Sequence, residues 1–508
     1  MLCNNISLIV VVKDIIMMLA NDYSRTRGWI VHSFIFSLLL SISSFSYATN
    51  GMDMEGYGPI ATSMGGASYA YDNGTAAMMN NVATLGLVND GESRFNLALG
   101  FLGPTIEVKH AGSGSQIRSR ANAFYMPAIG YATRKGDFTY GVGMFSQGGM
   151  GAEYDSDSFL SIGTDEKALS QVGVGRLLFP LAYNVNDSLV IGGSLDYVWG
   201  MMDIRMPMAG SDLMSFASGT SVFGAASGSL LTGLNNLMNP PAGPAVISGV
   251  NNAVIEFADG SDFSGEAFGD GFAGKVGLVY SVNDKLSIGI SYHNQTHLSD
   301  LIANNASLSM SADIDIGLAG GGAPTGYVTT NIPLTGKITV KDFQWPSTFG
   351  VGFKYLATKE WMIVADIKKI CWADVMKDFK MTFVADSTQR GIAAGFASAE
   401  MDMTMYQNWD DQYVLSLGAE YKYSPALKLR GGINVANNPV PDEFLNPLFP
   451  AIVKNHLTFG GGYKIAPSHW LDISLTYAMK ASQTNNNSGI SVSSHRQFNV
   501  QAMYCYRF

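Results

Sequence analysis

Long apolar runs and charge are both scarce in this chain of 508 residues. Charged residues make up only 14 % of it, and beyond the first fifty positions no unbroken apolar run approaches the roughly 20 residues that a membrane-spanning helix needs. This composition is too apolar for a solvated multidomain enzyme. An apolar protein without spanning helices has one other way to live in lipid, the closed β-barrel, whose strands satisfy all backbone polar groups among themselves.

Cysteine and net positive charge are lacking as well. The three cysteines, Cys3, Cys371 and Cys505, are too few and too isolated for a disulfide framework or a metal site. The formal net charge of −10 disfavours nucleic acid, which calls for a basic patch. No nucleophile and histidine stand at a spacing that supports catalysis. We therefore expect no catalytic residues, no metal and no cofactor.

The N-terminus has the pattern of a signal peptide. Two arginines precede the apolar stretch Trp29–Leu40, and small residues follow it up to Ala48. We expect cleavage after Ala48, so that residues 1–48 are missing from the mature protein. Because a second apolar run lies further upstream, Met17 or Met18 is a better start than the first methionine.

From about residue 93 the chain alternates with period two. A strand places residues i and i+2 on one face, so the apolar residues of the last segment share a face while Asn499 and Gln501 share the other. The apolar faces end in aromatic residues, the girdle expected at membrane interfaces. We therefore predict an all-β, antiparallel transmembrane barrel over residues 93–508.

The connections between these segments alternate between short and long. The short ones carry turn residues and are 134–136, 186–188, 283–285, 358–360, 424–426 and 466–469. The long ones lie near 110–120, 148–172, 208–268, 299–334, 382–410, 437–454 and 482–495. Thirteen connections imply fourteen strands, and an even number with short turns inside and long loops outside is typical of bacterial outer-membrane barrels.

The segment 49–92 alternates with neither a strand nor a helix period. It is rich in Gly, Ala and Met and almost free of lysine and arginine, whereas a free leader would be polar and charged. We predict that it is a hatch, a plug inside the lumen; the alternative is a disordered leader. The hatch residues singled out are Met52, Met54, Tyr57, Met64, Met78, Met79, Asn81 and Ala83.

The hatch pattern ATSMGGASYAYDNGTAAMMNNVATL resembles the FadL-type transporters of long-chain fatty acids and aromatic hydrocarbons. Where that family carries Asn-Pro-Ala, this chain has Asn81-Val82-Ala83, without the proline. Further matches are Pro346 within KDFQWPSTFGVGFKY, GINVANNPVPDE at Gly432–Glu443, and the terminal YCYRF. The resemblance implies a passive outer-membrane transporter of hydrophobic molecules, with capture by outer loops, an internal pocket, and lateral release through the barrel wall.

Two sets of apolar residues are candidates for that route. Strand parity turns one set towards the lumen, to line a pocket or merely to pack on the hatch: Leu102, Phe124, Met126, Phe145, Leu178, Val198 and Met202. The other set lies in a predicted helix over Phe223–Met238 and consists of Phe223, Leu230, Leu231, Leu234 and Leu237. By resemblance, the loops 208–268 and 299–334 form an outer groove. Plain packing on the barrel rim is the alternative for the second set.

Glycines interrupt the third predicted strand. Gly148, Gly149 and Gly151 stand where the family's third strand kinks inward and opens the wall, although they could equally begin the second outer loop. At the other end of the chain, Tyr504, Tyr506 and Phe508 resemble the assembly signal of outer-membrane barrels.

The expected partners follow from this interpretation. They are a hydrophobic small molecule, outer-membrane lipid and the barrel-assembly machinery, with no nucleic acid and a monomeric state. Two other functions stay open: a porin for small polar solutes, and an outer-membrane barrel enzyme.

Overall fold

The computed structural model describes residues 50–257 and 267–508. The predicted signal peptide, its cleavage site at Ala48 and the proposed starts at Met17 or Met18 lie outside these residues. None of the helices in the described part of the chain is both long and apolar enough to cross a membrane.

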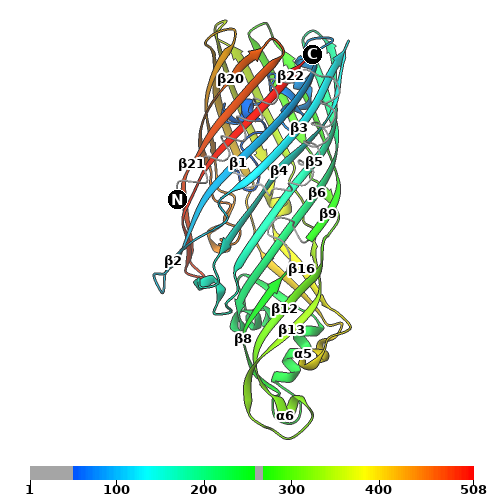
Figure 1. The fold of residues 1–508 in the computed structure, drawn as a ribbon, viewed down its shortest axis with the longest axis vertical. Helices are drawn as coiled ribbons and strands as arrows, with labels where there is room; N and C mark the ends of the chain where they lie inside the picture. The colour runs from blue at the N-terminus through cyan, green and yellow to red at the C-terminus, as the bar shows by residue number, and fades with distance from the viewer. Residues whose placement is uncertain (1–49, 258–266) are drawn as a thin grey trace, which may run out of the picture. The chain divides into compact units, whose positions relative to one another are not determined.

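One closed ring of antiparallel strands forms the wall (Figure 1). In ring order its strands are β1 (Ser93–His110), β3 (Phe124–Lys135), β4 (Phe138–Tyr154), β5 (Ala168–Asn186), β6 (Leu189–Ala209), β9 (Ala267–Ser281), β10 (Leu286–His293), β14 (Thr348–Leu356), β15 (Trp361–Ile370), β18 (Gln412–Lys422), β19 (Leu427–Ala436), β20 (Asn455–Ala466), β21 (His469–Asn485) and β22 (Ile490–Arg507). Each strand pairs with the next, and β22 pairs with β1. The predicted closed antiparallel barrel is confirmed.

The predicted number of fourteen strands is too low for the sheet as a whole, because segments assigned to long loops also form strands. Within residues 50–257 and 267–508 the sheet has 22 strands. The additional strands are β2 (Gln116–Arg118), β7 (Gly224–Ser227), β8 (Ile247–Glu256), β11 (His297–Leu298), β12 (Leu301–Asp315), β13 (Tyr327–Lys341), β16 (Asp378–Ala385) and β17 (Glu400–Tyr406). Helices α4 (Gly210–Ser218), α5 (Ser229–Met238), α6 (Ile316–Ala319) and α7 (Trp372–Val375) lie between them.

The inner face of the wall changes character along the strands. Within about ten residues of the short turns, a part we call the turn half, buried inward side chains are mostly polar or charged: Asn96, Asp196, Lys275, Asp366, Glu420, Arg430, Asp472 and Thr476. Beyond it, in the loop half, they are mostly apolar: Leu102, Ile106, Ile204, Met206, Met208, Met310, Leu334, Met381, Met401 and Met403.

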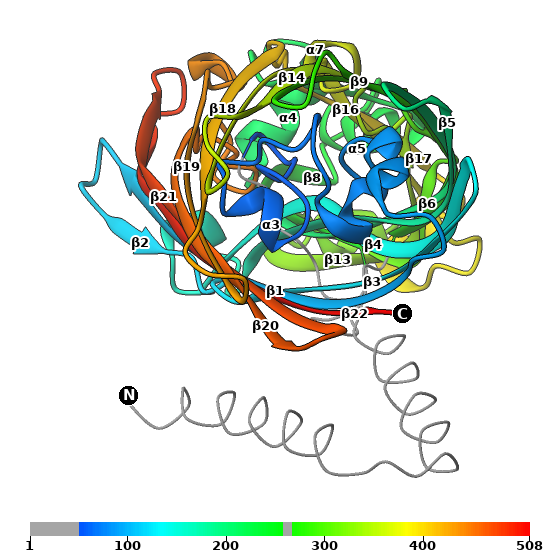
Figure 2. The ribbon, with the colours of Figure 1, turned by 90° about the horizontal axis from the view of Figure 1, so that it is seen from above.

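Residues 50–92, the N-terminal segment, lie inside the ring, as the blue trace in Figure 2 shows. The segment forms only a short α3 (Pro59–Thr62) and two 3-10 turns, η1 (Gly74–Met78) and η2 (Val82–Leu87). Nearly all of its residues up to Gly86 are buried. All eight predicted hatch residues are buried, with Tyr57 the most exposed at 8 %.

Candidate functional site

Hydrogen bonds fasten the N-terminal segment to the polar wall of the turn half. The carboxylate of Asp366 on β15 accepts from the backbone N–H groups of Ser68 and Tyr69, at 2.6 and 3.1 Å. Thr458 of β20 accepts from the N–H of Gly65 at 2.9 Å. A segment with little regular structure has many unpaired backbone groups, and the polar lumen supplies their partners.

Wall glycines let the segment approach the strands closely. A Cβ atom at Gly289 would lie 1.7 Å from the carbonyl oxygen of Tyr69, and one at Gly432 would lie 2.3 Å from the nitrogen of Gly65. Both distances are far shorter than van der Waals contact, so any other residue would push the segment away. The wall is therefore shaped around this segment.

An ion pair marks the turn end of the segment. Nη1 of Arg94 on β1 lies 2.6 and 2.7 Å from the two carboxylate oxygens of Asp72. Burial acts to raise the pKa of the Asp72 carboxyl, but the Arg94 guanidinium outweighs this effect and holds the pKa below its usual value.

A second charged cluster sits at the level where the two halves meet. Asp196 of β6 binds Arg176 of β5 at 2.9 Å and Lys275 of β9 at 2.8 Å, with all three side chains almost completely buried. Lys275 also donates to the carbonyl oxygen of Met78 at 3.2 Å, and Arg176 to the side-chain oxygen of Gln147. These residues were not singled out from the sequence, although single charges at inward positions of apolar strands would have indicated them.

The seven predicted lumen residues are buried in the described structure, with exposures from 0 % for Leu102 to 8 % for Phe124. All seven belong to one hydrophobic cluster together with residues of the N-terminal segment. They occupy the inward positions that parity assigned to them.

Three tryptophans that were not singled out from the sequence pack together. Trp372 meets Trp345 and Trp409 edge-on, with ring centroids 5.5 and 5.4 Å away. The ring of Trp372 lies over Gly51, and that of Trp345 over Gly148, where added Cβ atoms would come within 2.7 Å of the indoles. The tryptophans come from separate stretches of chain, so their grouping could not be read from spacing.

Strand β4 is irregular at its glycines. Its pairing with β5 shifts register between Ser146 and Gly148. There the strand turns to the N-terminal segment: Gly148 forms a bridge with Asp53, and the N–H of Gly149 donates to the carbonyl oxygen of Met52 at 3.0 Å. The glycines are not the start of a loop, because β4 continues through Gly151 to Tyr154.

The wall between β3 and β4 is incomplete beside this irregularity. Their pairing ends at Ala128 and Phe145, although both strands continue towards the loops. Contact resumes further on, where the N–H of Arg120 donates to the carbonyl oxygen of Glu153 at 2.8 Å. Between these limits β3 pairs only with β1, and β4 only with β5 and the N-terminal segment. We call this unpaired interval the wall gap.

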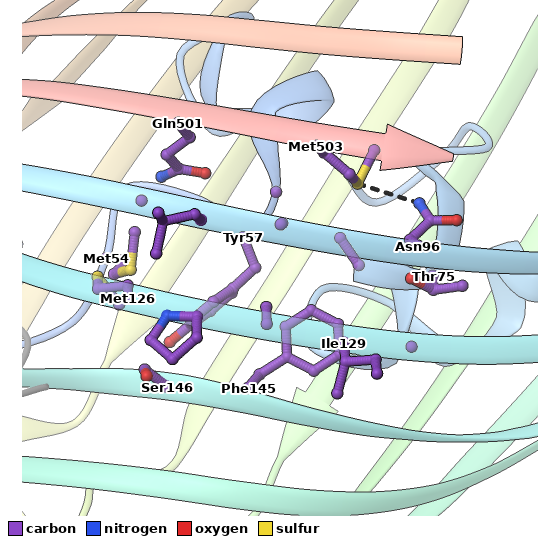
Figure 3. A pocket seen from close by; sticks show the side chains of 18 residues that line it. Met54, Tyr57, Thr75, Asn96, Met126, Ile129, Phe145, Ser146, Gln501 and Met503 are labelled. Carbon is purple, nitrogen blue, oxygen red and sulfur yellow. Dashed lines mark hydrogen bonds between the residues drawn. The ribbon is translucent and has the colours of Figure 1, made fainter. Parts of the chain in front are cut away.

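A cavity of about 40 Å³ lies at the wall gap (Figure 3). Lumen residues line it, including Met54, Tyr57 and Met126, and so do Leu99 and Ile129 from the outward positions of β1 and β3. The cavity is narrow, with room for a few small atoms.

The outer apolar residues differ from expectation. Helix α5 begins at Ser229 rather than at Phe223, because Gly224–Ser227 form β7, which pairs with β17. Leu230, Leu231 and Leu234 are buried, while Phe223 and Leu237 are only partly so. The first three leucines therefore pack inward and do not present an open surface.

The chain ends by closing the ring. Ser93 and Phe508 exchange backbone hydrogen bonds of 2.7 and 2.9 Å. The ring of Tyr506 stacks on those of Phe508 and His469. The hydroxyl of Tyr504 and Nδ1 of His469 form a hydrogen bond of 2.6 Å. Phe508 is 56 % exposed on the outer surface.

Nothing in the described residues suggests metal chemistry. No group of three or more His, Cys, Asp or Glu side chains there could hold a metal ion, and Cys371 and Cys505 are both free thiols.

Solved structures of transport proteins resemble this fold. The toluene transporter TodX of P. putida matches with a TM-score of 0.73 and 27 % identity over 90 % of this chain and 99 % of its own. The toluene transporter TbuX of Ralstonia pickettii matches with a TM-score of 0.67 and 28 % identity over 89 % of this chain and 99 % of its own. These neighbours are transport proteins, not enzymes.

A curated relative and a family model complete the comparison. An uncharacterized protein of Chlorobium limicola, from the 5′ region of a phosphoenolpyruvate carboxykinase gene, is 37 % identical over 111 residues, which is 22 % of this chain; the chain spans about half (53 %) of that relative's length. The model of the outer membrane transport proteins (OMPP1/FadL/TodX) matches residues 41–504. The chain belongs to this family of outer-membrane transport proteins for hydrophobic compounds.

Proposed function

We propose that this protein is a passive channel through which small hydrophobic molecules enter from outside and leave sideways into the membrane. The observation that carries the proposal is the change of lumen character. An apolar solute is stabilised in the loop half, where side chains such as Met206 and Met403 line the wall. It gains nothing in the turn half, which is polar and already filled by the N-terminal segment.

The wall gap supports a lateral exit. It lies beside Met126 and Phe145, close to where the apolar lumen ends, and Gly148 and Gly149 bend β4 away from β3 there. A solute leaving at this level would pass from one apolar environment to another without crossing the polar turn half. In this proposal the N-terminal segment is the hatch, and the seven lumen residues line the route to the gap.

The outer elements supply the entrance. Because three leucines of α5 are buried, we propose that the outer groove opens only when α5 and its neighbours part from the rim. Methionines lining the loop half have flexible, polarizable side chains that adapt to solutes of different shape. The names of TodX and TbuX make an aromatic hydrocarbon such as toluene the first solute to test.

Uptake and conductance distinguish this proposal from a porin, which the polar wall of the turn half would otherwise favour. Cells lacking their own proteins of this family should take up labelled toluene faster when they express this chain, and the purified protein should conduct few ions in a planar bilayer. Large steady currents without toluene uptake would favour the porin.

Assembly and processing complete the proposal. We propose that the protein is a monomer inserted by the barrel-assembly machinery, with Phe508 as part of its signal. Deleting Phe508 removes the two terminal backbone hydrogen bonds between the last residue and Ser93, and it should lower the yield of folded, heat-modifiable protein. N-terminal sequencing of membrane fractions should return Thr49 or a residue close to it.

A further inference from the structure

The bend of β4 rests on contacts from the N-terminal segment. Three of them meet within three residues of the strand: the hydroxyl of Tyr57 lies 2.6 Å from the carbonyl oxygen of Gln147, Gly148 bridges to Asp53, and the N–H of Gly149 donates to Met52. In a regular ladder these backbone groups of β4 would face β3 instead. The segment thus replaces the missing neighbour strand.

Tyr57 is the only side chain among these three contacts. Its phenol reaches from the N-terminal segment towards the strand that carries Phe145 and Ser146 (Figure 3), and it lines the cavity at the wall gap. Burial, and then the carboxylate of Asp53, raise the pKa of the Tyr57 hydroxyl well above its usual value, so the proton stays on the oxygen.

That single proton faces two acceptors. The hydroxyl lies 2.7 Å from an oxygen of Asp53 as well as 2.6 Å from the Gln147 carbonyl, and it donates to one of them at a time. Lys368 of β15 binds the other oxygen of Asp53 at 2.9 Å and offsets its charge. The Tyr57 hydroxyl thus lies within hydrogen-bond distance of both Asp53 of the segment and the Gln147 carbonyl of the strand.

The far side of the bend is held as well. The side chain of Gln147 accepts from Arg176, which Asp196 fixes in turn. The bulged residue is thus held through its backbone by the segment and through its side chain by the wall. Straightening β4 would break both hydrogen bonds, and moving the N-terminal segment would break the first.

We propose that Tyr57 is a positioning residue that ties the N-terminal segment to the bend of β4, so that the element filling the lumen also keeps the wall gap open. This inference rests on the proposed lateral exit. The segment is then a strut, a support for β4, as well as a plug: when its Tyr57 end detaches, the backbone groups of β4 at the bend lose their partners and the wall gap is no longer held in shape.

Hydrogen exchange on the purified full-length protein tests the strut, with two matched variants. Tyr57→Phe removes one oxygen from the contact with β4. Tyr71→Phe removes the equivalent oxygen from another buried tyrosine of the segment, whose hydroxyl donates to Ala67 at 2.6 Å and stays within the segment. Folded protein is scored in both by its heat-modifiable migration.

We expect amides of β4 from Gln147 to Ala152 to exchange roughly threefold to tenfold faster in Tyr57→Phe, as the loss of one buried hydrogen bond implies, and to be unchanged in Tyr71→Phe. Toluene uptake should fall in the first variant only. Equal exchange of β4 in wild type and Tyr57→Phe would overturn the strut, as would equal increases in the two variants.

Wild-type protein gives a second test that needs no folded variant. If the segment and the bend open together, the amides of Tyr57 and Gly149 share one opening equilibrium and are protected to the same degree within about threefold. Protection of Gly149 that exceeds that of Tyr57 by more than tenfold would contradict the inference. That result would not contradict the lateral exit itself, which is tested separately by closing the wall gap with a disulfide.

Discussion

In the turn half of the barrel the polar side chains point inward and the apolar ones face outward, whereas in the loop half the inner face is apolar. On β13, for example, Ile338 is buried within the wall, while Lys337 is exposed and Thr339 half-buried on the outer face. The first arrangement belongs in lipid and the second in water. The same period-two alternation therefore builds a wall with an apolar outer face in the turn half and a wall with a polar outer face and an apolar inner face in the loop half.

The largest effect should come from reversing this difference in the loop half. Met403 of β17 is 1 % exposed, so Met403→Lys would bury an unpaired charge at a cost on the order of 3–5 kcal/mol. We expect little folded protein and no toluene uptake. Its neighbour points the other way, so Thr404→Lys should fold and transport normally; equal damage from both variants would show that the two faces do not differ.

Crowding the junction of the two halves should be next in size. A Cβ atom at Gly148 would lie 2.2 Å from the carbonyl oxygen of Met52 and 2.7 Å from the Trp345 ring. Gly148→Val with Gly149→Val should reduce toluene uptake roughly tenfold at normal abundance, since overpacking costs about 1–3 kcal/mol. The control is Gly193→Val, where an added Cβ has no neighbour closer than 3.4 Å. If the double variant took up toluene at the wild-type rate, the exit would have to lie elsewhere in the barrel.

Displacing the N-terminal segment from the turn half should leave a polar lumen that conducts ions. Gly289→Val pushes against Tyr69 of the N-terminal segment, whereas a Cβ at Gly274 has no neighbour closer than 3.5 Å. We expect steady ion currents in planar bilayers from Gly289→Val and small ones from Gly274→Val and wild type. Small currents from all three would mean that the segment is not what blocks the lumen.

The smallest effect concerns pH at the turn end. The lowered pKa of Asp72 stabilises the bound segment above the ordinary pKa of an aspartate, and this contribution is lost as pH falls through the lowered value. Because Asp72 is partly exposed, we expect no more than about 1 kcal/mol. The protection factor of the Gly74 amide, which donates to Asp72, should fall in acid in wild type and should not change with pH in Asp72→Asn.

Period-two alternation predicted the closed barrel and the inward positions of the lumen residues, because side-chain direction in a strand follows from the backbone. It missed β12, β13, β16 and β17. Those strands alternate, but their outward faces are mostly polar, so they lack the apolar outward face by which a membrane strand is identified in a sequence. Contacts such as Asp53 with Lys368, 315 positions apart, depend on how the ring closes and leave no local pattern.

A reversible clamp across the wall gap tests the lateral exit most directly. The register of Ala128 with Phe145 makes Pro127 and Ser146 the next pair if β3 and β4 zip further, and paired strands are close enough for a disulfide. In a chain with Cys371→Ser and Cys505→Ala, Pro127→Cys with Ser146→Cys should take up toluene when reduced and stop when oxidised, with folded abundance unchanged. Equal uptake in the oxidised and reduced states would contradict lateral release through this gap.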